Sequence, residues 1–136
     1  MGGEWVIVAD PTDAAAVGAA ADVRAEFERY ERALVDGDLH VMEEQFWAGP
    51  DVVRFGIADQ QVGAEALADW RRRQPPLPLG RSLQQTRVAA VSGDLVIVTT
   101  CFTYPGRRQL GRQSQTWARL ADGWRIVHAH VSEIDP

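Results

Sequence analysis

Residues 81–132 read RSLQQTRVAAVSGDLVIVTTCFTYPGRRQLGRQSQTWARLADGWRIVHAHVS. This half of the chain is rich in β-branched and aromatic residues, which favour strands. Small or polar residues interrupt it, as tight hairpins require, at Ser92-Gly93, residues 105–108 and residues 121–123. The stretch therefore predicts an antiparallel meander of four strands, at residues 81–91, 94–104, 109–120 and 123–132.

The first half of the chain predicts helices instead. Between residues 13 and 36, apolar side chains recur at three- and four-residue spacings with charged residues largely between them, which indicates a long amphipathic helix. Gly37 follows it where a C-cap glycine would stand. We expect a short extended segment at residues 5–9 before this helix and a second short helix at residues 38–47 after it.

The middle of the chain connects these two halves. Residues 51–55 and 57–62 predict two short strands, and residues 64–73 predict a helix that ends before two prolines. Helices followed by a meander make an α+β domain, with the helices gathered on one face of a strongly bent antiparallel sheet. We expect one domain over residues 1–136, with its core in residues 14–133 and a ligand cavity between the long helix and the concave face.

The composition excludes several function classes. The chain has 136 residues and a net charge of −5, so it is long enough for one core and too acidic for a general nucleic-acid binder. All 14 basic residues are arginine, so no lysine can form a Schiff base. The sequence has no window resembling a membrane span or a secretory signal, and the single Cys101 predicts a reducing compartment. We expect a cytoplasmic protein with no nucleic-acid or membrane partner.

Two side chains in this pattern are candidates for chemistry. Tyr30 shares a helix face with Phe27 and Leu34, so it is either a core aromatic or a phenol that faces the cavity and donates a proton. Arg54 stands in an apolar strand, so it lies at a solvated edge or is buried with an acid or an anionic ligand. The residues alone leave both alternatives open.

The strand at residues 111–117, GRQSQTW, is unusually rich in hydrogen-bonding side chains. Alternation divides these side chains into two rows. We expect one row to line a polar pocket or a wet dimer interface on the concave side, without a preference between them. The rows are Arg112, Ser114 and Thr116 on one face, and Gln113, Gln115 and Trp117 on the other.

The last strand contributes His128 and His130, which strict alternation places on the same face as Trp124, Ile126 and Ser132. Two histidines at this spacing bind a metal ion only with further ligands, and the chain offers only His40 and scattered acids. We therefore predict no metal site. We interpret both histidines as hydrogen-bonded or acid–base groups.

Three consecutive arginines, Arg71 to Arg73, close the helix at residues 64–73. They could form an anion site. Cations are also favourable at the C-terminal end of a helix dipole, and this is the interpretation that the sequence favours.

Several motifs together resemble a known family. The motifs are Phe27-Glu28-Arg29-Tyr30-Glu31, Phe46-Trp47, Val53-Arg54-Phe55-Gly56, Gly111 to Trp117, Gly123 to Val127, and His130-Val131-Ser132. In this order of elements they resemble the AtzH-like family, which includes the oxalurate-catabolism protein HpxZ. That family lies within the nuclear-transport-factor-2-like (SnoaL-like, cystatin-like) superfamily. The resemblance covers residues 23–132.

The resemblance implies a cone-shaped fold, a homodimer, no cofactor, and hydrolytic decarboxylation of an N-carboxylated urea, 1,3-dicarboxyurea to allophanate. The family's tyrosine and arginine fall on Tyr30 and Arg54, where Arg54 would grip a carboxylate and Tyr30 would protonate the departing nitrogen. The chain has the short acid Asp59 after the Arg-Phe-Gly strand, which predicts an altered pocket. The further pocket residues that we expect are Trp47, Phe55, Arg112, Gln113, Ser114, His128 and His130.

The last two strands also resemble the association domain of calcium/calmodulin-dependent kinase II, which is an assembly module. Three functions therefore stay open, because one fold can serve several. The leading hypothesis is a cofactor-independent amidohydrolase or decarboxylase acting on a small anionic ureide, of the N-carboxyurea or oxalurate type. The alternatives are a non-catalytic ligand-binding or assembly subunit that partners an amidase, and a SnoaL-like isomerase or dehydratase.

Overall fold

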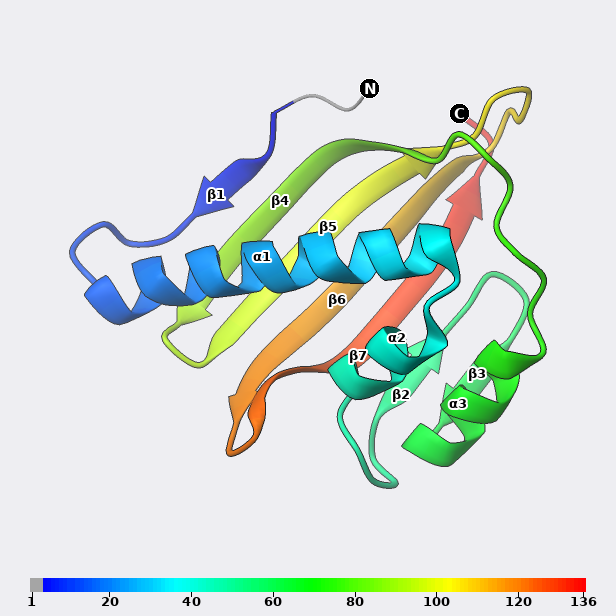
Figure 1. The fold of residues 1–136 in the computed structure, drawn as a ribbon. Coiled ribbons are helices and arrows are strands. Elements are labelled where there is room, and N and C mark those ends of the chain that lie inside the picture. Colours follow the sequence, from blue (N-terminus) through cyan, green and yellow to red (C-terminus); the bar gives the residue numbers. More distant parts are fainter. Residues whose placement is uncertain (1–3) are drawn as a thin grey trace.

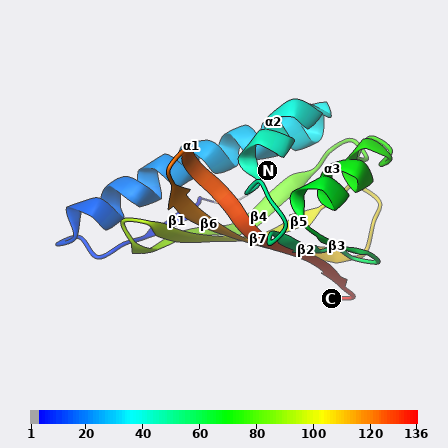
Figure 2. The ribbon, with the colours of Figure 1, turned by 90° about the horizontal axis from the view of Figure 1, so that it is seen from below.

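The computed structural model describes residues 4–136. Within this range, three helices lie on one side of a seven-stranded sheet, and the long helix crosses the strands obliquely (Figures 1 and 2). The α+β fold expected from the sequence is confirmed. In chain order the elements are β1 (Val6–Val8), α1 (Ala14–Asp36), α2 (Leu39–Gln45), β2 (Val53–Phe55), β3 (Gln60–Val62), α3 (Ala64–Arg72), β4 (Ser82–Ser92), β5 (Leu95–Thr103), β6 (Leu110–Leu120) and β7 (Gly123–Ile134).

The sheet has the strand order β1-β4-β5-β6-β7-β2-β3. Strands β4 to β7 form the antiparallel meander that the sequence predicts. The sheet is not wholly antiparallel, because β1 runs parallel to β4 and β2 runs parallel to β7. The second of these pairings places Arg54 opposite Ala129, so a residue from the helical half of the chain joins the end of the meander.

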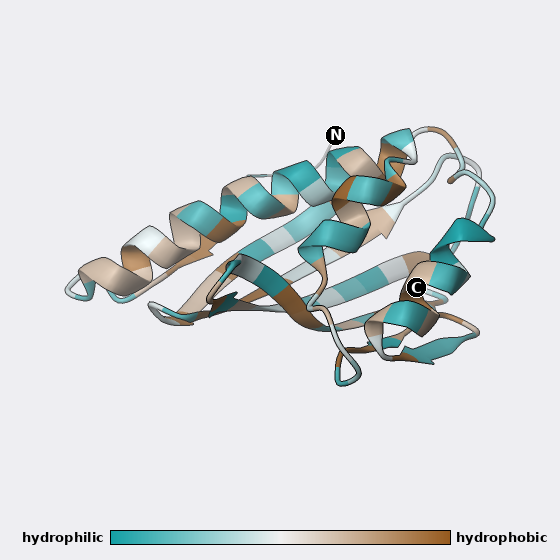
Figure 3. Ribbon diagram, turned by 60° about the horizontal axis from the view of Figure 1, so that its bottom comes forward, coloured by the Kyte–Doolittle hydropathy of each residue, from teal (hydrophilic) through white to brown (hydrophobic). Residues whose placement is uncertain are grey.

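Helix α1 begins and ends at signals present in the sequence. The Asp13 side chain accepts a hydrogen bond from the Ala16 backbone N–H, and Gly37 closes the helix with a left-handed φ of 72°. Figure 3 shows hydrophobic and hydrophilic bands alternating along the helix. Its buried residues are Ala16, Ala19, Ala20, Val23, Phe27, Tyr30 and Ala33.

The size of these buried residues changes along α1. Alanines dominate the first half, where the helix approaches the sheet closely, and the two aromatic residues lie further on. Figure 2 shows the helix diverging from the sheet toward its C-terminal end. The two layers therefore form a wedge whose wider end lies at the C-terminal part of α1.

The core lies between α1 and the meander, where Phe27, Trp117 and Ile126 are fully buried. Gln115 is buried with them and accepts a hydrogen bond of 3.0 Å from the indole Nε1 of Trp117. A buried amide of this kind needs such a partner. The row that contains Gln113, Gln115 and Trp117 thus faces the concave side, and the row of Arg112 and Ser114 faces outward.

A β-bulge in β7 changes the expected alternation. Trp117 pairs with Ile126, whereas the preceding Thr116 pairs with His128, so Val127 is an extra residue on its strand. Trp124 and Ile126 point into the core before the bulge. The prediction that His128 and His130 lie on the same face as Trp124 and Ile126 was wrong, because the bulge shifts both histidines to the outer face.

Candidate functional site

A cavity of about 660 Å³ lies where α1 diverges from the sheet. Its walls come from the C-terminal part of α1, the end of α3, the proline-rich segment at residues 74–78 and the inner faces of β2, β5, β6 and β7. The volume is typical of small-molecule sites. Among the predicted site residues, Tyr30, Arg54 and Gln113 line this cavity.

Tyr30 presents its phenol to the cavity. Its ring packs edge-on against Phe46, with the ring centroids 6.2 Å apart, and the residue is only 5% exposed. Within residues 4–136 the Tyr30 hydroxyl forms no hydrogen bond, although it is both a donor and an acceptor. It therefore has hydrogen-bonding capacity left for a ligand.

Arg54 is held by β2, β3 and α3. Its Nη1 donates hydrogen bonds to Asp59 Oδ1 at 2.8 Å and to Gln61 Oε1 at 3.1 Å. Its guanidinium carbon lies 4.1 Å from the centroid of the Trp70 ring. The sequence left two alternatives for Arg54, and the structure shows the second, a buried arginine with an acid partner. The Arg54 side chain is 11% exposed.

The surroundings of Arg54 disfavour the positive charge of its guanidinium. Burial lowers the pKa of Arg54 below its ordinary value, and the nearby Arg71 guanidinium lowers it further. The Tyr30 phenol and the Asp59 carboxylate act in the opposite direction and raise this pKa. Since the guanidinium contacts the cavity, an anion there would restore favourable charge interactions.

Arg71 also lines the cavity. From the sequence, the favoured interpretation of this residue was a cation at the C-terminal end of a helix dipole. It is 7% exposed, and its Nη1 lies 3.3 Å from Met42 Sδ. Nη2 is buried without a hydrogen-bond partner among residues 4–136. The spacing of Arg71 four residues after Leu67, which is also buried, was the signal that could have revealed it, because both lie on one helix face.

Arg81 anchors a second network on the cavity wall. It forms a two-pronged ion pair with Glu31, and it donates to the Tyr104 hydroxyl at 3.1 Å and to Gln113 Oε1 at 3.3 Å. Gln113 Nε2 in turn donates to Glu31 at 3.1 Å. Burial acts to lower the pKa of Arg81, but the Glu31 carboxylate outweighs it and raises that pKa above its ordinary value. The sequence did not single out Arg81, since its partner Glu31 lies far away in the chain.

The remaining predicted pocket residues lie outside this cavity. Phe55 and the two histidines form an aromatic group on the outer face, with Phe55 5.8 Å from His128 and 5.7 Å from His130 between ring centroids. His128 Nδ1 contacts the Val53 carbonyl oxygen at 3.0 Å. Arg112 and Ser114 lie on this face as well, and Trp47 packs at the edge of the core.

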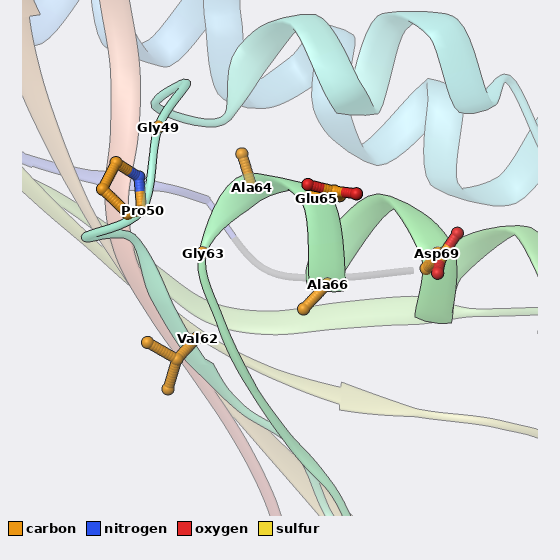
Figure 4. A pocket seen from close by; sticks show the side chains of 8 residues that line it. All are labelled: Gly49, Pro50, Val62, Gly63, Ala64, Glu65, Ala66 and Asp69. Carbon is orange, nitrogen blue, oxygen red and sulfur yellow. The ribbon is translucent and has the colours of Figure 1, made fainter.

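A second hollow, of about 750 Å³, lies beside the start of α3 (Figure 4). Its charged side chains are the carboxylates of Glu65 and Asp69, and the rest of the lining is small or apolar. An anion would be repelled there. The concave cavity, which is lined by several arginines, fits an anionic ligand better.

Residues 4–136 lack two kinds of feature. None of the helices in this range is both long and apolar enough to cross a bilayer. The same residues contain no cluster of three or more His, Cys, Asp or Glu side chains arranged to hold a metal ion.

Comparison with protein families gives a match over nearly the whole chain. The model of the family described as AtzH-like matches residues 12–136. The chain belongs to the AtzH-like family. This AtzH-like sequence has no match among the curated proteins.

Solved structures resemble this AtzH-like protein over most of its length. A cystatin-like fold protein from Burkholderia xenovorans LB400 is 49% identical, with a TM-score of 0.84, 88% of this chain covered and 94% of that chain. A protein of unknown function from Pectobacterium atrosepticum is 38% identical, with a TM-score of 0.86 and coverages of 92% and 98%. A nuclear-transport-factor-2-like protein from Pseudomonas putida KT2440, at 21% identity, a TM-score of 0.71 and coverages of 85% and 87%, shares the fold.

Proposed function

We propose that this AtzH-like protein is a cofactor-independent amidohydrolase or decarboxylase that acts on a small anionic ureide. One observation carries the proposal: the Tyr30 phenol, with no protein partner for its hydroxyl among the described residues, lines the same cavity as Arg54. The activity that the family resemblance implies needs a proton donor and a cation of this kind. The two side chains come from α1 and β2, and both line this cavity.

Arg54 keeps donors for a substrate in spite of its ion pair. Both of its hydrogen bonds to protein groups leave from Nη1. Arginine has five N–H donors in a planar fork, so Nη2 and Nε can bind a carboxylate of the substrate. Stacking on Trp70 fixes the plane of the fork before the ligand arrives.

The proposed step is cleavage of the bond between the ureide nitrogen and its carboxylate carbon. The electron pair of this bond stays on nitrogen, which takes the proton of the Tyr30 hydroxyl, and carbon dioxide leaves. Water then returns a proton to the phenolate, and the hydroxide formed combines with carbon dioxide as bicarbonate. The arginine contributes by holding the carboxylate in line with the phenol while charge develops on nitrogen.

The test is turnover by the purified protein on N-carboxyureas, measured as released bicarbonate. Oxalurate, whose carboxylate is not bound to nitrogen, tests the amidohydrolase alternative, measured as hydrolysis to urea and oxalate. We expect Arg54→Ala to lower the rate by roughly a hundredfold or more, since a donor to developing charge is removed. Arg73→Ala, a change to an exposed arginine of α3's C-cap, is the matched control and should keep full activity. An inert wild type across this panel would remove the proposal.

One observation favours the alternative of a subunit that assembles with itself or with an amidase. The outer face of the sheet carries exposed apolar side chains: Phe55, 38% exposed, lies beside both histidines, and Ile97, 37% exposed, lies on β5. Apolar side chains grouped on a sheet face are typical of interfaces. We propose that this face joins two copies in a homodimer, which sedimentation equilibrium of wild type and Phe55→Glu tests. Co-purification with an amidase and no turnover alone would favour the non-catalytic role.

A further inference from the structure

Five arginines line the concave cavity, and they differ in one respect. Four of them form an ion pair with a carboxylate of the protein, whereas Arg71 forms none within residues 4–136. The four pairs are Arg54 with Asp59 at 2.8 Å, Arg72 with Glu43 at 3.2 Å, Arg81 with Glu31 at 2.9 Å and Arg107 with Glu133 at 3.4 Å.

The setting of Arg71 is unfavourable for a cation. The residue is 7% exposed, and its guanidinium carbon lies 5.3 Å from the Phe46 ring centroid and 5.8 Å from that of Trp70. Aromatic faces and the Met42 sulfur attract the charge only weakly compared with a carboxylate. A buried charge without a counter-ion is costly, so a purely structural role would be served better by an apolar side chain.

Arg71 is also close to the groups that carry the proposed chemistry. Arg54 and Arg71 share the Trp70 ring, so their guanidinium carbons are separated by at most the sum of their two distances to it. Tyr30 and Arg71 share the Phe46 ring in the same way. Tyr30 and Arg71 both line the cavity, so an anion held there by Arg71 would share the cavity with the Tyr30 hydroxyl.

We propose that Arg71 anchors the substrate carboxylate together with Arg54. This inference rests on the proposed function, because it names a further anion-binding residue of that same cavity. The other four arginines of the lining each have a carboxylate partner in the protein, so Arg71 is the one whose charge lacks a counter-ion among residues 4–136. A carboxylate of the ligand would supply it.

The experiment compares wild type, Arg71→Met and the control Arg73→Met by calorimetric titration and thermal unfolding. The probes are N-carbamoylglycinate, a stable ureide with one carboxylate, its neutral amide, and the dianion malonate. We expect the first probe to bind wild type and Arg73→Met and to raise their unfolding temperatures. Arg71→Met should weaken binding roughly ten- to a hundredfold, the loss of one charge-assisted contact. The neutral amide should not bind, and malonate should also lose affinity in Arg71→Met.

The ligand-free proteins give a second readout that a structural role would not produce. Arg71→Met should unfold at the same or a higher temperature than wild type, because it replaces an unpaired buried charge by an apolar side chain. If Arg71→Met does not fold, Arg71→Lys should fold and bind the probe more weakly, since it keeps the charge and loses the planar fork.

Wild-type affinity for N-carbamoylglycinate in the Arg71 variant that folds, or no binding by wild type, would overturn the inference. These failures are separable from failure of the proposed function. Anion binding that depends on Arg71, without any turnover, removes the catalytic proposal alone, and turnover without such dependence removes this inference alone.

Discussion

Arg81 and Glu31 form a two-pronged ion pair across the wedge, with Nε 2.9 Å from Oε1 and Nη2 3.3 Å from Oε2. The two side chains are 5% and 12% exposed, so neither is well solvated. The pair connects α1 to the residue just before β4, and it therefore fixes the width of the cavity at that point.

Breaking this pair should be costly. Glu31→Ala leaves the Arg81 charge buried without its carboxylate, and we expect the free energy of unfolding to fall by about 3–5 kcal/mol. Urea denaturation followed by circular dichroism measures this. Glu28→Ala, an exposed acid on the same helix, is the control and should change stability by less than about 0.5 kcal/mol. Equal effects of the two substitutions would contradict the role of the pair.

The Tyr30 hydroxyl should matter for turnover and hardly for folding. Because the hydroxyl bonds to no described protein group, Tyr30→Phe should change the free energy of unfolding by less than about 0.5 kcal/mol. Loss of the proton donor should lower turnover of N-carboxyureas by roughly a hundredfold or more.

Tyr104→Phe gives the contrasting case on the same cavity wall. It removes an acceptor for Arg81, so it should lower stability by about 1 kcal/mol and leave the proton donor in place. Rates and urea midpoints of the two variants, measured side by side, make the comparison. A Tyr30→Phe protein with full activity would show that another group supplies the proton.

Asp59 should set how much negative charge the cavity accepts. Asp59→Asn removes one charge and keeps an oxygen that can accept from Arg54 and Gln61. The charge of Arg54 would then act on the ligand without competition from Asp59, so malonate should bind at least about tenfold tighter than to wild type. Titration calorimetry measures the change, with the exposed Asp51→Asn as control. Unchanged malonate affinity would show that Asp59 does not compete with ligands.

Gly111 should be intolerant of a side chain. A Cβ at this position would overlap the Phe102 ring, which stacks over the Arg81 guanidinium at 4.2 Å. Gly111→Ala should therefore lower the free energy of unfolding by about 1–3 kcal/mol through overpacking. Gly18→Ala in α1, where nothing lies within 4 Å, should raise it by roughly 0.5–1 kcal/mol. Thermal unfolding of both proteins tests the difference in sign.

Much of the fold follows from local patterns in the sequence. The helix at residues 13–36 and the four-strand meander depend on periodicity, caps and turns, which neighbouring residues determine. The parallel pairings of β1 and β2 depend on contacts between distant segments, and no local signal specifies them. Arg54 could be recognised as unusual in its strand, but alternation alone could not decide between a solvated edge and a buried position, so its pairing with Asp59 was left open.

The candidate site was predicted in part for a related reason. Tyr30 and Gln113 occupy the faces that simple periodicity allows, and both line the cavity. The two histidines do not, because alternation cannot foresee an inserted residue. Arg71 was assigned to the end of a helix dipole, which overlooked that its helix buries this one arginine and leaves Arg72 and Arg73 exposed.

The extra residue at Val127 makes the last strand sensitive to length rather than to side-chain chemistry. Deleting it would restore strict alternation, so that His128 and His130 would enter the interior in phase with Ile126, while Ala129 and Val131 would turn to solvent. A one-residue deletion here would thus exchange the two faces of the strand beyond this point. Individual residues of β7 can therefore be substituted one by one, whereas a change in their number would replace the side chains that β7 contributes to the cavity lining.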